Sequence, residues 1–322
     1  MTPEDLPAEF LPEQDRSPQF SPLTWCRLMR LPTVFTAWSN ILCGYLLTRT
    51  VTAQEALRDT HLLLLLCSSA GLYLGGMVLN DFCDASLDAA ERPERPIPSG
   101  QIARWKAGML AGAMMLFGVA CAFAVGIGSL QIALILVVAV TAYDYWLKHT
   151  SAGPLAMAAC RFFNLMLGAS GVAASEPAAL WQFPQTAVAG ALFTYIVGVT
   201  WFARHEALVS SARPLWTGLL VVMCGLLIDG WVIRSAAAGD PPRFAALVCL
   251  SLLAANLLLR AAAAIRSRQP RQIQKTVGLM LLSLIFLDSI VIFAKTGDAA
   301  LASLVVILVV PATLLKRVIP MS

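Results

Sequence analysis

The chain has 322 residues, of which 58% are hydrophobic and 13% are charged, and its mean hydropathy is +0.73. A soluble globular domain carries about 25% charged residues, so this composition excludes a fold that is surrounded by water. The net charge of +4 comes from basic residues near the ends of apolar segments and does not indicate a nucleic-acid-binding protein. We therefore expect an all-α, polytopic membrane protein.

The first element in chain order is a polar segment that is rich in proline and acidic residues. It lacks the basic start and apolar core of a signal peptide. We expect residues 1–26 to form a mobile tail and residues 27–322 to form a single transmembrane domain.

Long apolar segments follow the tail. A helix needs about 20 predominantly apolar residues to cross a bilayer, and ten segments of the chain meet this condition. The predicted spans are residues 31–49, 61–80, 106–127, 130–147, 154–173, 186–203, 214–233, 243–265, 274–295 and 299–316.

The basic residues predict how these spans are oriented, because Lys and Arg are enriched on the cytoplasmic side of a membrane. If the N-terminus is cytoplasmic, all but five of the 23 basic residues lie on the inner side of the ten spans. We therefore predict a multi-pass protein of a bacterial-type inner or plasma membrane, with both termini in the cytoplasm. The five exceptions are Arg49, Arg58, Arg234, Arg243 and Lys295.

The connection between the second and third spans, VLNDFCDASLDAAERPERPIPSG (78–100), is unusually acidic. On a helix that continues the second span, Asn80, Asp81, Asp84 and Asp88 would share one face, since they are three or four residues apart. Neighbouring carboxylates repel one another, and near a membrane this is costly unless a cation neutralises them. Their oxygen atoms suit Mg²⁺, which usually takes one or two carboxylates together with phosphates.

Two arginines, Arg92 and Arg95, follow these carboxylates directly. Guanidinium groups bind phosphate, so the stretch predicts a site for a diphosphate that is held through Mg²⁺. A solvated acidic loop without a ligand remains the alternative.

The pattern NDxxDxxxD followed by RPxRPIPSG resembles the first aspartate-rich motif of the UbiA-type intramembrane prenyltransferases, which attach isoprenoid chains to acceptors such as aromatic rings. Three further stretches are similar to helices of that family: RLMRLPTVFTAWSNILCGYLL (27–47), YDYWLKHT (143–150) and GPLAMAACRFFNLMLG (153–168). The resemblance covers residues 27–295.

The resemblance implies a nine-helix bundle around a central cavity that opens to the lipid, with span 299–316 as an addition. It implies transfer of an isoprenyl group from a prenyl diphosphate to a hydrophobic, for example aromatic, acceptor in the membrane, with Mg²⁺ as the cofactor. The implied metal ligands are Asn80, Asp84 and Asp88. The implied catalytic residues are Asp84, Asp88, Lys148 and Arg161, and the implied substrate-binding residues are Asn80, Asp81, Arg92, Arg95, Tyr143, Asn164, Arg204 and Glu206.

The chain departs from the family at the second aspartate motif, DxxxD. The equivalent stretch reads TYIVGVTWFARHEALVSSARP (194–214), where Glu206 is the only acidic residue. A similar R-x-E pattern is found in the EboC-type UbiA-like subgroup. Two hypotheses stay open: Arg204 pairs directly with the diphosphate while Glu206 orients it, or the cavity binds or transports an isoprenoid lipid without catalysis.

Several of these residues also have simpler interpretations. Lys148 could be an interfacial lysine, Asn164 could join two helices by a hydrogen bond, and Asp144 could neutralise Lys148 or pair with Arg161. Asp288, within the ninth span, either lines the cavity or makes a structural hydrogen bond.

Overall fold

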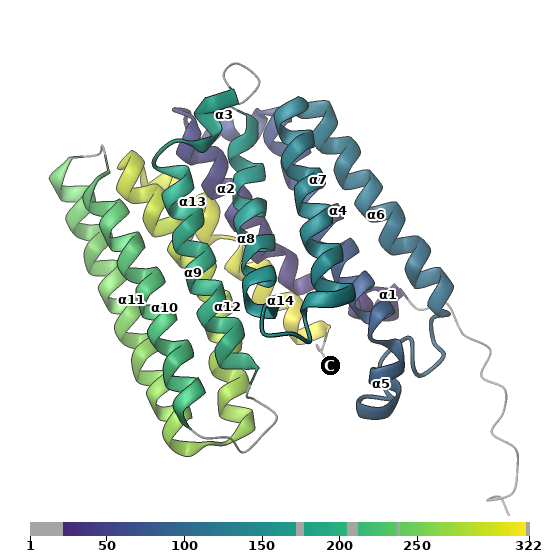
Figure 1. Cartoon of the computed structure of the whole chain (residues 1–322). Helices are drawn as coiled ribbons and strands as arrows, with labels where there is room; N and C mark the ends of the chain where they lie inside the picture. Colours follow the sequence, from purple (N-terminus) through teal and green to yellow (C-terminus); the bar gives the residue numbers. More distant parts are fainter. Residues whose placement is uncertain (1–21, 172–176, 205–211, 237–238, 320–322) are drawn as a thin grey trace, which may run out of the picture.

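The computed structural model describes residues 22–171, 177–204, 212–236 and 239–319, and all regular secondary structure in these ranges is helical. Figure 1 shows one bundle of long helices that run roughly side by side. In chain order the helices are α1 (Pro22–Leu28), η3 (Leu31–Thr33), α2 (Val34–Thr48), α3 (Ala53–Arg58), α4 (Thr60–Cys83), α5 (Ala85–Glu91), α6 (Arg104–Val125), α7 (Ile127–Ala142), η4 (Tyr143–Leu147), α8 (Gly153–Ala169), η6 (Pro177–Trp181), α9 (Gln185–Ala203), α10 (Ala212–Arg234), α11 (Asp240–Ser267), α12 (Pro270–Thr296), α13 (Ala299–Val306) and α14 (Val309–Val318).

Each of the ten predicted spans coincides with a helix or with two consecutive helices. Within the described residues, eight helical segments are long and apolar enough to cross a membrane. The other two, α2 and α8, have only 15 and 17 residues. Helix α2 starts late because Pro32 and the left-handed backbone of Arg30, with φ of 48°, produce a separate 3-10 turn before it. The protein is therefore an integral, multi-pass, all-helical membrane protein.

The helices form a ring that is divided across its middle by the contact between α2 and α8, which we call the α2–α8 wall. Around the ring, α2, α4, α6, α7, α8, α9, α10, α11 and α12 each pack against the next, and α12 packs against α2 again. Helices α2 and α8 also pack against each other inside the ring. This contact separates a half that contains α4 and α7 from a half that contains α9 to α12.

Two glycines make the α2–α8 wall thin. A β-carbon on Gly44 of α2 would lie 2.1 Å from the Leu165 carbonyl oxygen, and one on Gly168 of α8 would lie 2.3 Å from the Ile41 carbonyl oxygen. The two backbones therefore touch at a place where no larger residue fits. As a result, Asn40 of α2 can form hydrogen bonds both with Arg161 of α8 and with Asp288 of α12.

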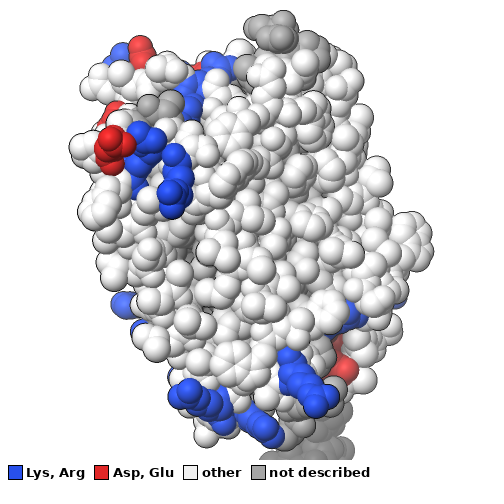
Figure 2. All heavy atoms as spheres, turned by 60° about the vertical axis from the view of Figure 1, so that its left-hand side comes forward, with Lys and Arg blue, Asp and Glu red and all other residues white. Residues whose placement is uncertain are grey.

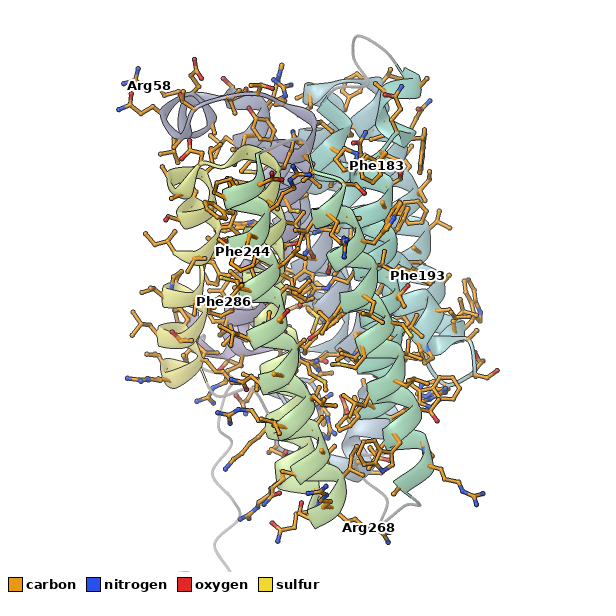
Figure 3. The ribbon with its side chains drawn as sticks, turned by 90° about the vertical axis from the view of Figure 1, so that its left-hand side faces the viewer. Arg58, Phe183, Phe193, Phe244, Arg268 and Phe286 are labelled. Atoms are coloured by element: carbon orange, nitrogen blue, oxygen red, sulfur yellow. The ribbon has the colours of Figure 1, made fainter. Side chains whose placement is uncertain are left out.

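The outer surface is suited to lipid. Figure 2 shows basic and acidic side chains gathered towards the two ends of the visible face, with a wide uncharged band between them. In Figure 3, Arg58 and Arg268 lie at opposite ends of the bundle, while Phe244 and Phe286 point outward between them. Phe244 is 71% exposed, which is unfavourable in water and favourable in a hydrocarbon layer.

The tenth predicted span belongs to the bundle but is not one continuous helix. It breaks between α13 and α14 at Ile307 and Leu308. Pro311 explains the break, since its nitrogen cannot donate a hydrogen bond to the carbonyl of residue 307. Helix α14 packs against η3 and α2, where Ala312 joins a buried cluster with Val34 and Phe35.

The N-terminal boundary differs from the expected one. Helix α1 starts at Pro22, five residues before the predicted start of the domain, and its Leu28 is fully buried. Leu28 belongs to a small apolar cluster with Val78 and Ile97, so α1 packs against the connection that follows α4. Residues 1–21 of the predicted tail lie outside the described part of the chain.

Candidate functional site

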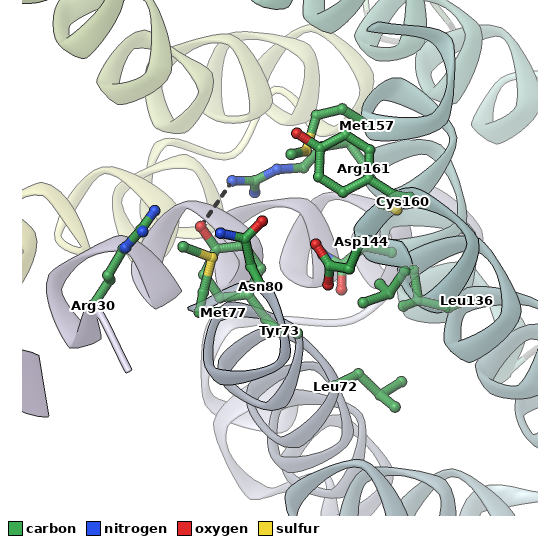
Figure 4. A pocket seen from close by; sticks show the side chains of 14 residues that line it. Arg30, Leu72, Tyr73, Met77, Asn80, Leu136, Asp144, Met157, Cys160 and Arg161 are labelled. Atoms are coloured by element: carbon green, nitrogen blue, oxygen red, sulfur yellow. Dashed lines mark hydrogen bonds between the residues drawn. The ribbon is translucent and has the colours of Figure 1, made fainter. Parts of the chain in front are cut away.

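A cavity of about 220 Å³ lies in the half of the ring that contains α4 and α7. Figure 4 shows Arg30, Asn80, Asp144 and Arg161 around this space, with Leu72 and Leu136 further along it. The cavity thus combines polar groups with an apolar portion. Its lining residues are Arg30, Leu72, Tyr73, Gly76, Met77, Asn80, Leu136, Val140, Tyr143, Asp144, Met157, Cys160, Arg161 and Asn164.

The end of α4 brings Asn80 to this cavity, and both Asn80 and Asp84 contact Lys148. The Lys148 Nζ atom lies 2.6 Å from Asp84 Oδ1 and donates a hydrogen bond of 3.4 Å to Asn80 Oδ1. His149 Nε2 lies 3.7 Å from the same Asp84 oxygen. The side chain of Lys148 is only 8% exposed, so its positive charge is held inside the site and is not an interfacial charge in solvent.

The position of Lys148 depends on a local distortion of the helix before it. Residues Tyr143–Leu147 form a π-helical turn, and the Lys148 N–H donates to the Tyr143 carbonyl, five residues back. Such turns insert an extra residue and re-aim the side chains around them, often at functional sites. Here the turn places Tyr143 and the buried Asp144 on the cavity and directs Lys148 towards Asp84.

The acidic residues after α4 do not share one face as the sequence predicts. The helix breaks at Asp84, which separates α4 from α5. Asp88 instead faces Arg95, whose Nη1 lies 2.7 Å from Asp88 Oδ2 and 3.6 Å from Asp81 Oδ1. Asp81 also pairs with Arg30 Nη2 at 2.8 Å. Asp81, Asp88 and Arg95 are each 5% exposed, so they form a buried ionic network.

This network changes the interpretation of two predicted residues. Asp88 is expected to ligate a metal with Asn80 and Asp84, but its carboxylate is turned into the pair with Arg95. Arg95 is expected to bind phosphate, but its guanidinium lies between Asp81 and Asp88. Both residues therefore support the connection that shapes the site rather than line the cavity.

Arg161 lies on α8 and reaches the cavity in the bundle interior, where it is 8% exposed. Its guanidinium donates to Asn40 Oδ1 at 3.3 Å, to Thr36 Oγ1 at 3.0 Å and to the Tyr73 hydroxyl at 3.3 Å. The guanidinium carbon also lies 5.0 Å from the centre of the Tyr73 ring. All of these partners are neutral, so the charge of Arg161 is positioned without being neutralised by direct contact.

Asn164, one turn beyond Arg161, lines the cavity and also joins three helices. It accepts a hydrogen bond from Ser69 Oγ at 2.7 Å and donates one to the Ala37 carbonyl at 2.9 Å. The structural interpretation of Asn164 therefore has direct support.

Two further predicted residues, Arg92 and Arg204, are not among those that line the cavity. Arg92 is exposed at the end of α5. Arg204 ends α9 and donates a hydrogen bond to the Thr150 carbonyl, in the connection that follows Lys148. Glu206 lies outside the described residues.

Sequence analysis does not identify Arg30 and Tyr73, which line the cavity, or Thr36 and Asn40, which bind Arg161. Thr36 and Asn40 are four residues apart in TVFTAWSN, so a polar face on the first span was a usable signal. Arg30 directly precedes that span, but its contact with Asp81 depends on the turn that contains Pro32.

The oxygen atoms of Asn80 and Asp84 are the described group that best fits a divalent cation. Within the described ranges no three His, Cys, Asp or Glu side chains gather at one point. Mg²⁺, however, usually takes only one or two carboxylates and completes its shell with water and substrate phosphate. Lys148 already places a positive charge between Asn80 Oδ1 and Asp84 Oδ1. Asn80 and Asp84 therefore fit a magnesium ion, whereas Asp88 does not join them.

Comparisons with known proteins identify the family and the fold of the chain. The sequence matches the UbiA prenyltransferase family over residues 37–290. A digeranylgeranylglyceryl phosphate synthase of Saccharolobus solfataricus is 32% identical over 127 residues, which are 39% of this chain and 44% of that protein. The chain thus spans less than half the length of this curated relative.

Two solved structures have a similar fold. A UbiA homologue from Aeropyrum pernix K1 superposes with a TM-score of 0.65 and 16% identity, over 81% of this chain and 96% of that one. A UbiA homologue from Archaeoglobus fulgidus bound to GPP and Mg²⁺ gives a TM-score of 0.59 and 17% identity, over 85% and 100% of the two chains. At these identities the similarity concerns the fold alone.

Proposed function

Because the chain belongs to the UbiA prenyltransferase family, we propose that it transfers an isoprenyl group from a prenyl diphosphate to a hydrophobic acceptor within the membrane. One observation carries this proposal: Asn80 and Arg161 line one cavity that also has an apolar portion, and Asn80 contacts Lys148, which pairs with Asp84. The Archaeoglobus fulgidus homologue, which is bound to GPP and Mg²⁺, supports the choice of ligand.

The polar end of the cavity would hold the diphosphate. Magnesium held by Asn80 and Asp84 would neutralise the negative charge that builds up on the leaving diphosphate. Lys148 and Arg161 supply fixed positive charges in a site with little water, where such charges act strongly on a developing anion. Arg30, paired with Asp81 at the rim, adds a third positive charge.

The apolar end would hold the isoprenyl chain. In the reaction, the bond between the first carbon of the isoprenyl group and the diphosphate oxygen breaks, and the oxygen keeps the electron pair. The same carbon forms a bond to the acceptor, and the acceptor releases a proton. The positive charge on the allylic carbon is stabilised by aromatic rings and by the exclusion of water. Tyr73 and Tyr143 supply the rings, and Leu72, Leu136 and Met157 supply the apolar walls.

The position of this site also supports the proposed orientation. Helices α1 and α5 and the C-terminal end of α14 lie towards the same end of the bundle in Figure 1, and Asp84 lies at the junction of α4 and α5. Arg268 lies at that end and Arg58 at the opposite one in Figure 3. With the basic residues on the cytoplasmic side, the site would open where soluble diphosphates are available.

A lipid carrier without catalysis is the second candidate, because the stretch after α9 lacks the second aspartate motif. Arg204 contacts the connection that bears Lys148, which favours the alternative that a guanidinium replaces part of that motif. The two functions differ in the fate of the ligand, since only an enzyme breaks the carbon–oxygen bond.

The test measures pyrophosphate released by purified protein from farnesyl or geranylgeranyl diphosphate, with Mg²⁺ and a membrane-lipid extract as the source of acceptor. We expect release by the wild-type protein, loss of release in EDTA, and at least a hundredfold decrease in Asp84→Ala, since one electrostatic contact to a transition state contributes a factor of about 10²–10³. Asp240→Ala is the matched control, because the Asp240 side chain is 95% exposed in a surface pair with Arg243. Intact diphosphate recovered equally from wild type and Asp84→Ala, across chain lengths, would support the carrier instead.

A further inference from the structure

Arg161 is buried in the interior of the bundle without a carboxylate in direct contact with its guanidinium. None of the ion pairs among the described residues includes Arg161. A buried guanidinium without any anion nearby is unfavourable in the membrane interior. A carboxylate on the far side of the α2–α8 wall supplies a nearby negative charge.

That carboxylate belongs to Asp288 of α12. Asn40 of α2 donates a hydrogen bond of 2.8 Å from Nδ2 to Asp288 Oδ2, while its Oδ1 accepts from Arg161 at 3.3 Å. Asn40 is fully buried and Asp288 is 5% exposed. The three residues therefore form one chain of hydrogen bonds across the thin wall.

The amide of Asn40 can be accommodated in only one orientation. One end of an amide accepts hydrogen bonds and the other end donates them. The donor end faces Asp288 and the acceptor end faces Arg161, so each neighbour reinforces the orientation that the other requires. If Asp288 lost its acceptor oxygens, the Asn40 amide could rotate and present its NH₂ group to the guanidinium.

We propose that Asp288 is a positioning residue for diphosphate binding, which acts through Asn40 to hold the Arg161 guanidinium at the cavity wall while leaving its charge free. The inference rests on the proposed function, in which Arg161 meets the diphosphate. A carboxylate in direct contact would form a strong bidentate pair with Arg161 and compete with phosphate. The intervening amide keeps the counter-charge near without that competition.

A nearby carboxylate provides a matched control. Asp229 of α10 is also 5% exposed and lines the same small internal space as Asp288. It is not a link in the chain from Asn40 to Arg161. General effects of removing a buried carboxylate should thus arise in both variants, whereas a positioning effect should arise only at Asp288.

The first test needs no substrate. Purified wild-type, Asp288→Leu and Asp229→Leu proteins are treated with phenylglyoxal, which modifies arginine, and the modification rate of Arg161 is read by mass spectrometry of its peptide. We expect a rate at least threefold higher in Asp288→Leu and unchanged in Asp229→Leu. Equal rates in all three proteins overturn the positioning role.

A milder variant keeps the test decisive if Asp288→Leu does not accumulate in membranes. Asp288→Asn keeps the size of the side chain but replaces one acceptor oxygen by a donor group. Its Arg161 modification rate should also exceed that of the wild-type protein, by a smaller factor. A rate equal to that of the wild-type protein counts against the proposal.

The second test concerns the free charge and uses geranyl S-thiolodiphosphate, an analogue that resists cleavage, with Mg²⁺. The double variant Asn40→Asp/Asp288→Asn keeps a hydrogen bond between positions 40 and 288, now donated from position 288, and places a carboxylate directly on Arg161. We expect wild-type or slower modification of Arg161 together with about tenfold weaker binding of the analogue. Equal affinity in both proteins overturns the argument about the intervening amide, whereas absence of binding to the wild-type protein overturns the proposed function itself.

Discussion

The substitution Gly168→Ala tests whether the thin α2–α8 wall holds the site together. A β-carbon at this position would lie 2.3 Å from the Ile41 carbonyl oxygen and 2.7 Å from the Ile41 α-carbon. Both atoms are backbone, so neither can rotate away as a side chain would. The two helices would have to move apart.

The size of this movement follows from the contact distances. Ordinary van der Waals contact starts near 3.4 Å, so the helices would separate by about 1 Å. Asn40 adjoins Ile41, and its hydrogen bond with Arg161 is already 3.3 Å long, so that bond would be lost. Overpacking costs about 1–3 kcal/mol, and with the lost bond we expect a decrease of about 3 kcal/mol in the free energy of unfolding.

The assay is reversible unfolding in mixed micelles with an increasing fraction of SDS, followed by tryptophan fluorescence. Gly190→Ala in α9 is the control, because a β-carbon there meets no atom within 4 Å. The control should be neutral or stabilising by up to about 1 kcal/mol, since alanine favours helix more than glycine does. If Gly168→Ala behaved like the control, the close contact of α2 and α8 would be refuted.

Three further predictions concern single contacts. Lys295→Met removes hydrogen bonds from Lys295 Nζ to the last carbonyls of α2 and should cost about 2 kcal/mol in the same unfolding assay; a change below about 0.5 kcal/mol would contradict this. Lys148→Met should reduce pyrophosphate release about a hundredfold, and Lys148→Arg should retain more of it, because the charge next to Asp84 is kept; equal rates would contradict the role of that charge. Partial burial raises the pKa of the Asp59 carboxyl. Hydrogen bonds from Tyr45 and from the His61 N–H, together with the charge of Arg49, outweigh burial and lower the pKa of Asp59. The stabilisation is therefore present above the ordinary pKa of Asp59 and is lost as the pH falls through its lowered value. Tyr45→Phe should cost about 1 kcal/mol at neutral pH and less towards about pH 3; a cost that does not change with pH would contradict this coupling.

The spans were predictable because the apolar length that crosses a bilayer is a local property of the chain. The second span was predicted at residues 61–80, and the structure has Thr60–Cys83. The tenth was predicted at residues 299–316, and the structure has two helices that cover Ala299–Val318. Its interruption was not predicted, although the effect of Pro311 on the preceding turn is local.

The acidic stretch was predictable as a cluster of charged residues near Arg95, but its internal pairing was not. The spacing of Asp81, Asp84 and Asp88 suggests one face of a helix, and this is correct only if the helix continues. The helix breaks at Asp84, which pairs with Lys148, while Asp81 and Asp88 pair with Arg95. Lys148 comes from another helix, so its effect on Asp84 depends on packing.

The sequence by itself determined the solvent, the number of apolar segments and the types of residue available for chemistry. Only the tertiary structure decided which polar groups meet, as Asn40 and Asp288 are 248 residues apart and yet share a hydrogen bond next to Arg161. The reason is physical: inside a bilayer a polar side chain has to find its partner within the bundle. Which partner it finds depends on how closely two helix backbones approach, and here two glycines bring α2 and α8 into contact.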